Sequence, residues 1–275
     1  MRIRKRALLQ KFFADRGTHL AAMIAYFALL SFVPLTFLAL AALGLAHRAD
    51  ESSFLVRELQ HAFPGTEIGR IVDLVRAVQK NAATLGIVGA VALLWTSLSL
   101  FSVLESALNI VYGRPNRGFL HGKAIALLFM VASLVTLFCA LLAGSLGAAA
   151  LRRYTPGFAS NGALAYLVSI GVSAFGVFLF LLSVYTLLVN DDVTVRDALP
   201  GAVLATVVLE ASFQILPVYE RYADVNPALR AFGGPAILLV WLYVMANFVV
   251  FGAEVNWWVA QRKSQRAVEE APGLA

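Results

Sequence analysis

Six long apolar runs, almost free of charge, dominate the chain. A helix needs about 20 residues to cross the hydrocarbon core of a bilayer, and each run reaches that length. Only one charged residue, Glu105, falls within the first three runs. We therefore predict an all-α, polytopic membrane protein with six transmembrane helices. The predicted spans are residues 20–46, 84–112, 124–151, 162–189, 198–219 and 234–260.

Composition supports this fold class. The 275 residues are 60% hydrophobic and 14% charged, against roughly 45–50% and about 25% for a soluble domain. This excess of apolar side chains excludes a soluble globular enzyme. It also excludes a disordered chain, and the single cysteine, Cys139, excludes a disulfide scaffold.

Both ends of the chain are expected on the cytoplasmic side. The basic segment 1–19 precedes an apolar run that is too long for a secretory signal, so that run is expected to stay as an anchor. Of 22 Lys and Arg residues, 13 fall in segments on the same side as the N-terminus, and such residues mark the cytoplasmic face. We expect residues 261–275 to form a loose cytoplasmic tail. The start of the chain is expected to form a surface helix with its apolar residues toward lipid, namely Leu8, Leu9, Phe12 and Phe13.

Residues 47–80 form the longest segment predicted outside the membrane. After Pro64 and Gly65, apolar residues recur at helical spacing with charges at the intervening positions. We predict an amphipathic helix on the outer face, which either caps the bundle or covers a cavity. The net charge of +6 is assigned to contact with membrane lipids and not to nucleic acid.

Polar residues inside the predicted spans form the candidate site. Ionisable groups in a membrane are costly and usually face the bundle interior. At 1.5 Å per residue, Glu105 and Glu254 both lie in the cytoplasmic third, level with the start of the fifth span. Two hypotheses follow: a polar cluster at the mouth of a cavity, or an ion-pair latch that locks the helices. The candidate residues are Glu105, Asn109, Arg117, Asp197, Glu210, Asn247, Glu254 and Asn256.

Helix packing and chemistry give further expectations. Small residues at helical spacing in the fourth span, including Ser173 and Gly176, predict close packing there. Pro235 is expected in the first turn of the sixth span. No catalytic, cofactor-binding or metal-binding residues are predicted, because the histidines are scattered and phosphate-loop spacing is absent. The acidic turn Asn190, Asp191, Asp192 and Asp197 could hold a divalent metal, but a solvated turn is the preferred interpretation.

Several runs together resemble one known family. The runs are AYFALLSFVPL (25–35), LGIVGAVALLWTSLSLFSVLESALNIVYG (85–113), VRDALPGA (195–202) and WLYVMANFVVFGAEVN (241–256). They are similar to the YihY family, also called the virulence factor BrkB family, with an older ribonuclease label. The resemblance implies a multi-pass bacterial inner-membrane protein and a structural role for further motif positions. These are Tyr26, Ser31, Pro34, Gly86, Gly89, Trp95, Pro200, Gly201, Trp241 and Gly252.

Three classes of function follow from these features. A transporter or translocator of a lipid or small molecule is favoured, since three spans carry polar stripes and the resemblance implies an export role. A non-transporting scaffold for envelope integrity is the alternative. Ribonuclease activity is not expected, because the sequence supplies no convincing set of metal-binding or acid-base residues.

Overall fold

The computed structural model describes residues 6–45, 82–133, 162–225 and 227–270. These ranges are helical apart from short turns and contain no strand. The predicted amphipathic segment 47–80, and the predicted third span beyond residue 133, lie outside the described residues. The elements are α1 (Arg6–Ala14), α2 (Gly17–Leu45), α5 (Ala82–Tyr112), a helix over Phe119–Ser133, α8 (Gly162–Ser183), the π-helix η1 (Val184–Leu188), α9 (Val195–Val225) and α10 (Pro227–Glu270).

Four described helices contain stretches that are long and apolar enough to cross a membrane. They are Leu94–Tyr112, Ile170–Leu188, Val195–Ile215 and Leu238–Gln265. The apolar helices Gly17–Ser31 and Phe119–Ser133 are shorter within the described part of the chain. Large apolar side chains such as Phe175 on α8 and Val207 on α9 are exposed. Exposed apolar area of this extent suits a protein surrounded by lipid.

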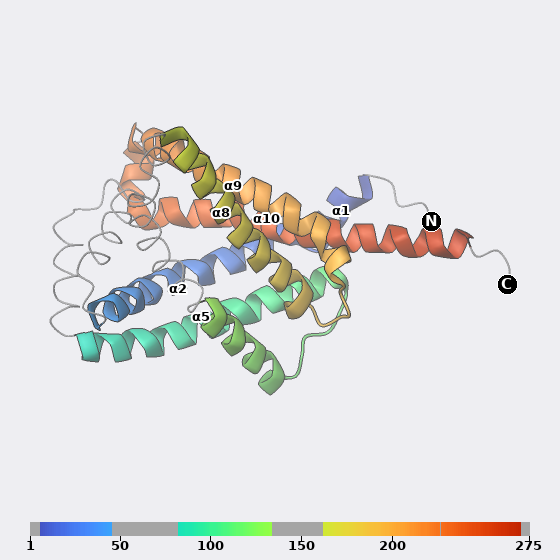
Figure 1. Ribbon diagram of the computed structural model, residues 1–275, viewed down its shortest axis with the longest axis horizontal. Coiled ribbons are helices and arrows are strands. Elements are labelled where there is room, and N and C mark those ends of the chain that lie inside the picture. Colours follow the sequence, from blue (N-terminus) through green and yellow to red (C-terminus); the bar gives the residue numbers. More distant parts are fainter. Residues whose placement is uncertain (1–5, 46–81, 134–161, 226, 271–275) are drawn as a thin grey trace.

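Helix α10 is the central element. It packs against α1, α2, α5 and α9, while α2 packs along α5 and α8 packs along α9. With 44 residues it measures about 66 Å, roughly twice the hydrocarbon thickness of a bilayer. Its C-terminal turns therefore extend past the bundle, at the end where α1 also lies (Figure 1).

Two predictions about helix ends are wrong. The helix that follows the 113–118 turn begins at Phe119, five residues before the predicted third span. The expected loose tail after Gln261 is helical to Glu270, and Pro235 lies inside α10, because that helix begins at Pro227. Charged flanking residues end an apolar run, but they do not end the helix. The backbone hydrogen bonds of a helix can continue into the part of it that lies in water.

The closest helix approach is between α9 and α10 at Gly201 and Gly252. A Cβ on Gly201 would lie 2.0 Å from the Gly252 carbonyl oxygen. Pro200 lacks an N–H and its ring crowds the preceding turn, and the next N–H, that of Gly201, donates to Asn256 Oδ1 at 2.6 Å. The close packing expected at Gly176 of α8 is not found within the described residues, where a Cβ would meet nothing within 4 Å.

The π-helix η1 interrupts the end of α8 and directs Tyr185 into the core. Tyr185 is fully buried, and its hydroxyl donates to the Val249 carbonyl of α10 at 2.7 Å. The Tyr185 oxygen would lie 2.5 Å from a Cβ on Gly252. Glycine at 252 therefore makes room for both Gly201 and Tyr185.

We expect Gly201→Ala to destabilise the protein by at least 1–3 kcal/mol, about the cost of overpacking a core. The added methyl group would meet backbone, which cannot rotate away. Thermal unfolding in detergent measures the effect. Gly176→Ala is the matched control and should unfold near the wild-type temperature; an equal loss in both variants would contradict the close crossing.

Candidate functional site

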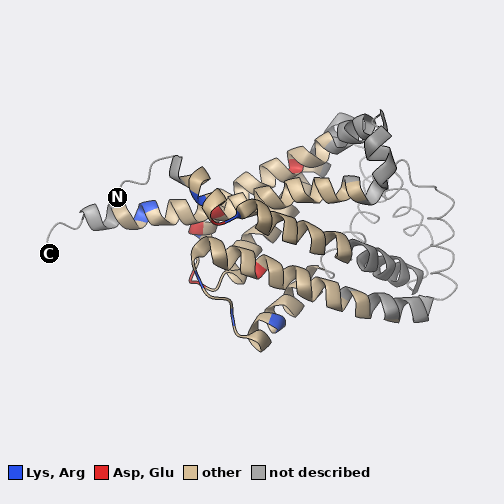
Figure 2. Ribbon diagram, turned by 180° about the vertical axis from the view of Figure 1, so that it is seen from behind, with Lys and Arg blue, Asp and Glu red and all other residues tan. Residues whose placement is uncertain are grey.

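Most of the charged residues coloured in Figure 2 lie toward one end of the bundle. There the turn 113–118 after α5 and the turn 189–194 before α9 meet α1 and the later turns of α10. We call this region the polar end. It brings together residues from α1, α5, η1, α9 and α10. For this reason it is the candidate functional site.

Arg117 holds the end of η1. Its guanidinium donates to the carbonyl oxygens of Leu187 at 3.0 Å, Leu188 at 2.5 Å and Val189 at 2.7 Å. The last carbonyls of a helix have no partner within it and carry partial negative charge, so a cation is favoured there. Arg117 therefore fixes the turn 113–118 against the end of η1.

Glu105 pairs with the same guanidinium. Arg117 Nη1 lies 3.4 Å from Glu105 Oε1, and the two side chains are 15% and 7% exposed. Gly122 of the next helix packs against this carboxylate, which a Cβ there would approach within 3.1 Å. Glu105 is thus enclosed by its own ion pair and a neighbouring helix.

An amide network continues from this ion pair. Asn109 is fully buried; its Oδ1 accepts from the Asn190 N–H at 2.7 Å, and its Nδ2 donates to Asn116 Oδ1 at 3.2 Å. Asn116 donates in turn to Ser106 at 3.0 Å, and Asn190 Nδ2 to the Pro115 carbonyl at 2.9 Å. These bonds join the two turns at the polar end.

Glu254 of α10 is fully buried beside α1. Lys11 Nζ lies 3.0 Å from Glu254 Oε2, pairs with Asp15, and donates to the Val111 carbonyl at 2.7 Å. Neither Glu254 oxygen accepts a hydrogen bond of good geometry. The carboxylate is therefore balanced by charge alone.

Two more buried polar groups near Glu254 lack hydrogen bonds. They are the Tyr112 hydroxyl and the Asn256 Nδ2 amide. Asn256 is fully buried and uses its oxygen on Gly201. An unpaired buried polar group costs about 1–3 kcal/mol, so this part of the polar end is not arranged for stability alone.

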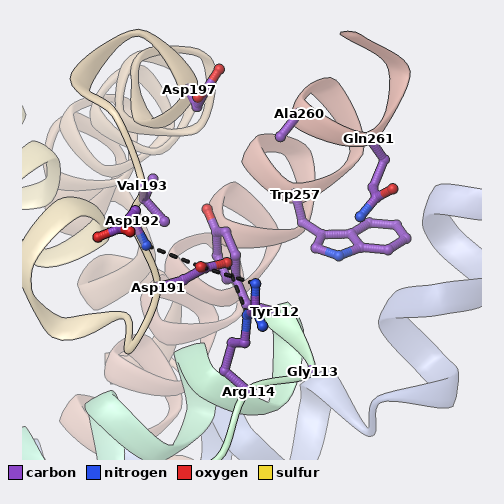
Figure 3. A pocket seen from close by; sticks show the side chains of 10 residues that line it. All are labelled: Tyr112, Gly113, Arg114, Asp191, Asp192, Val193, Asp197, Trp257, Ala260 and Gln261. Atoms are coloured by element: carbon purple, nitrogen blue, oxygen red, sulfur yellow. Dashed lines mark hydrogen bonds and ion pairs between the residues drawn. The ribbon is translucent and has the colours of Figure 1, made fainter. Parts of the chain in front are cut away.

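A pocket of about 310 Å³ opens beside this cluster (Figure 3). Asp191 on its wall accepts two hydrogen bonds from Arg114, both at 3.0 Å. Asp197 accepts from Lys263 at 2.7 Å and from Thr194, the residue before α9, at 2.7 Å. The lining residues are Tyr112, Gly113, Arg114, Asp191, Asp192, Val193, Asp197, Trp257, Ala260 and Gln261.

The acidic turn does not assemble a metal site in the described part of the chain. No group of three or more His, Cys, Asp or Glu side chains converges there. Asp191 and Asp197 face the same pocket but each has a basic partner, and Asn190 bonds to Pro115.

Glu210 and Asn247 lie away from the polar end. Glu210 accepts from Ser173 of α8 at 3.2 Å and from Gln214 at 3.4 Å. Asn247 donates to the Tyr243 carbonyl within its own helix at 2.7 Å. On α5, the Ser99 and Ser102 hydroxyls likewise donate to carbonyls of their own helix. Neither serine lines the pocket.

The positions implied by the resemblance differ in their surroundings. Ser31 bonds to the Phe27 carbonyl, and Trp241 packs its ring 5.0 Å from Phe213. Tyr26 and Trp95 are exposed. Pro34, Gly86 and Gly89 lie in α2 and α5, but their surroundings fall outside the description.

Sequence reasoning missed the contribution of α1. Phe12, expected toward lipid, is buried and packs 5.8 Å from Phe251, whereas Phe13 is exposed. Arg16, at φ 56°, turns the chain so that α1 lies against α10. The only visible signal was the four-residue spacing of Lys11 and Asp15, which pairs them on one helix face.

Comparisons with known proteins agree with the membrane fold. The chain matches the sequence model of a family described as virulence factor BrkB over residues 8–273. It is 24% identical to the ribonuclease-like protein YfkH of Bacillus subtilis (strain 168), covering 93% of this chain and 94% of that protein. It is 27% identical to a UPF0761 membrane protein of Aeromonas salmonicida (strain A449), over 90% and 85%. A UPF0761 membrane protein of Legionella pneumophila (strain Corby) is 26% identical over 98% of this chain but only 65% of its own length. No solved structure matches the chain.

The two arginines of the 113–118 turn provide a test of the polar end. Arg117→Ala would leave Glu105 buried without a partner, so we expect a loss of ~3–5 kcal/mol in unfolding free energy. Arg114→Ala removes a pair whose arginine is 51% exposed, with an expected loss of about 1 kcal/mol or less. Chemical unfolding in detergent compares them. Similar losses would mean that Arg117 does not hold the site together.

Proposed function

The chain belongs to the virulence factor BrkB family, and we propose that it serves there as an inner-membrane translocator of a lipid or small molecule, with the polar end as its cytoplasmic gate. The proposed translocator has six spans, both termini in the cytoplasm, and a gate at the polar end.

The proposed topology has six spans. Four apolar stretches of the described helices have the required length, and α2 and the helix from Phe119 supply the other two in part. An even number of spans returns the C-terminus to the side of the N-terminus, and α1 and the end of α10 do lie at one end (Figure 1). Since the basic residues concentrate in these segments, that side is assigned to the cytoplasm.

The buried carboxylate of Glu254 is the observation that supports a gate. It lies between membrane helices, is fully enclosed, and lacks good hydrogen bonds while Tyr112 and Asn256 nearby also lack them. A half-satisfied polar network is costly in a static core. Such groups suit an element that has a second arrangement in which water or a ligand satisfies them.

A scaffold is the second candidate, and one observation favours it. Glu105 and Glu210, the other two carboxylates of the spans, both have polar partners, and neither lines the pocket. In a scaffold the polar end would be a permanent latch. A gate would at times expose the buried residues of the polar end to water, whereas a permanent latch would keep them dry.

The nuclease name of the Bacillus relative is not carried over to this chain. A nuclease would need Asp191, Asp192 and Asp197 to converge on a metal. Two of these three are already paired with bases in the described structure.

The orientation can be tested with reporters. We expect green fluorescent protein fused after Ala275 to be fluorescent and alkaline phosphatase at the same position to be inactive, because both termini are assigned to the cytoplasm. Fusions before Met1 should behave identically. An active phosphatase at either end would exclude the proposed topology.

Thiol labelling can separate a gate from a latch. Thr206 of α9 is buried with an unpaired hydroxyl. In a Cys139→Ser background, we expect Thr206→Cys to react with a membrane-impermeant thiosulfonate from the cytoplasmic side. Glu254→Gln should raise the labelling rate of Thr206→Cys several-fold, because it removes the buried charge that holds the closed arrangement.

Two matched positions control this experiment. Ala107→Cys, in the packed core of α5, should remain unreactive, and Ser264→Cys, exposed on α10, should react at once. If Thr206→Cys stays as unreactive as Ala107→Cys with and without Glu254→Gln, the scaffold becomes the function to pursue.

A further inference from the structure

The ammonium of Lys11 occupies a site whose walls belong to other helices. Around Nζ lie Glu254 Oε2 at 3.0 Å, the Val111 carbonyl at 2.7 Å and the Trp257 ring, whose centroid is 4.3 Å away. Asp15, which directly follows α1, completes the shell. A carboxylate, a carbonyl and an aromatic face are the groups that recognise a primary ammonium.

The walls are fixed parts of the bundle. Glu254 and Trp257 come from α10, the central helix, and Glu254 is fully buried. Val111 is in the last turn of α5, where carbonyls have no helical partner and carry partial negative charge. The site therefore keeps its negative potential whatever cation is present.

Lys11, in contrast, belongs to a small element. Helix α1 has nine residues, too few to be stable alone, and it joins α2 through a short turn at Arg16. Phe12 packs against Phe251 of α10. Displacing α1 would leave Glu254 without its cation.

The neighbouring pocket adjoins this site. It shares Trp257 with the Lys11 shell, and Tyr112 on its wall follows Val111 directly. Asp191 and Asp197 are balanced by Arg114 and Lys263, whereas Asp192 has no ion pair within the described residues. Acidic lining of this kind raises the local concentration of cations.

We propose that the site built by Glu254, the Val111 carbonyl and Trp257 binds the primary ammonium of an external ligand, and that Lys11 is a tethered competitor for it. The shared chemistry is a primary amine, carried by a free amine or by the ethanolamine headgroup of a lipid. As the substrate class of the gate this rests on the proposed function, but the binding itself does not require transport.

A hard divalent cation fits the site less well. The bundle offers one carboxylate and one carbonyl oxygen, whereas Ca²⁺ and Mg²⁺ in proteins take about six or more oxygen ligands. A quaternary ammonium has no N–H to donate to these oxygens. The geometry thus separates primary amines from both, which makes the proposal testable with simple salts.

The test is chemical rescue of Lys11→Ala. We expect this variant to unfold at a lower temperature than wild type, because Glu254 loses its cation, and n-propylammonium chloride to restore at least half of the loss in a saturable manner. Tetramethylammonium chloride at equal ionic strength should not. Lys263→Ala, which removes an exposed partner of Asp197, is the matched control and should not respond.

The lipid arm uses nanodiscs of phosphatidylcholine with or without phosphatidylethanolamine. Rescue by propylammonium and also by phosphatidylethanolamine means that the site accepts a primary amine from either a free amine or a lipid headgroup. Rescue by propylammonium alone assigns the site to free amines. Rescue that persists in Lys11→Ala with Glu254→Gln, or no rescue by any primary amine, overturns the proposal.

A second measurement uses the wild-type protein, in case Lys11→Ala does not fold. Saturating propylammonium should increase amide hydrogen exchange in residues 6–14 several-fold, because α1 is displaced, while tetramethylammonium leaves it unchanged. Unchanged exchange in α1 with propylammonium would overturn the proposal. Neither readout depends on labelling at Thr206, so a failed gate and a failed amine site are distinguishable.

Discussion

The backbones of α9 and α10 touch at Gly201 and Gly252, and the polar end is built around this contact. Because no side chain separates the helices, the Asn256 oxygen reaches the Gly201 N–H and the Tyr185 hydroxyl reaches the Val249 carbonyl. Small residues permit such approaches in membranes, where van der Waals packing and interhelical hydrogen bonds replace the hydrophobic effect.

Around this contact, the polar groups form two zones with different degrees of satisfaction. Arg117, with Glu105 and the carbonyls that end η1, forms a zone in which charges and hydrogen bonds are paired. Glu254 belongs to a second zone, where Lys11 supplies charge but the hydrogen bonds are incomplete. The first zone holds the turns in place. The second has the properties of a region that changes its partners.

Much of the polar end follows from sequence once the spans are known. Glu105 and Glu254 were expected at the same depth from helix rise alone, and Asn109 is on the same face of α5 as Glu105. Their pairing partners could not be derived in the same way. A helical wheel gives the direction of a side chain relative to its own axis, but not which neighbouring helix it meets.

By itself, the sequence determined the all-helical membrane class, because this class depends on local run length and hydropathy. Tertiary structure alone decided that Lys11 meets Glu254 and that the pocket lies among Asp191, Asp197 and Trp257. Each of these contacts depends on how α1 and α10 are placed relative to α5 and α9. That placement is set by close packing between residues far apart in the chain, which no local pattern records.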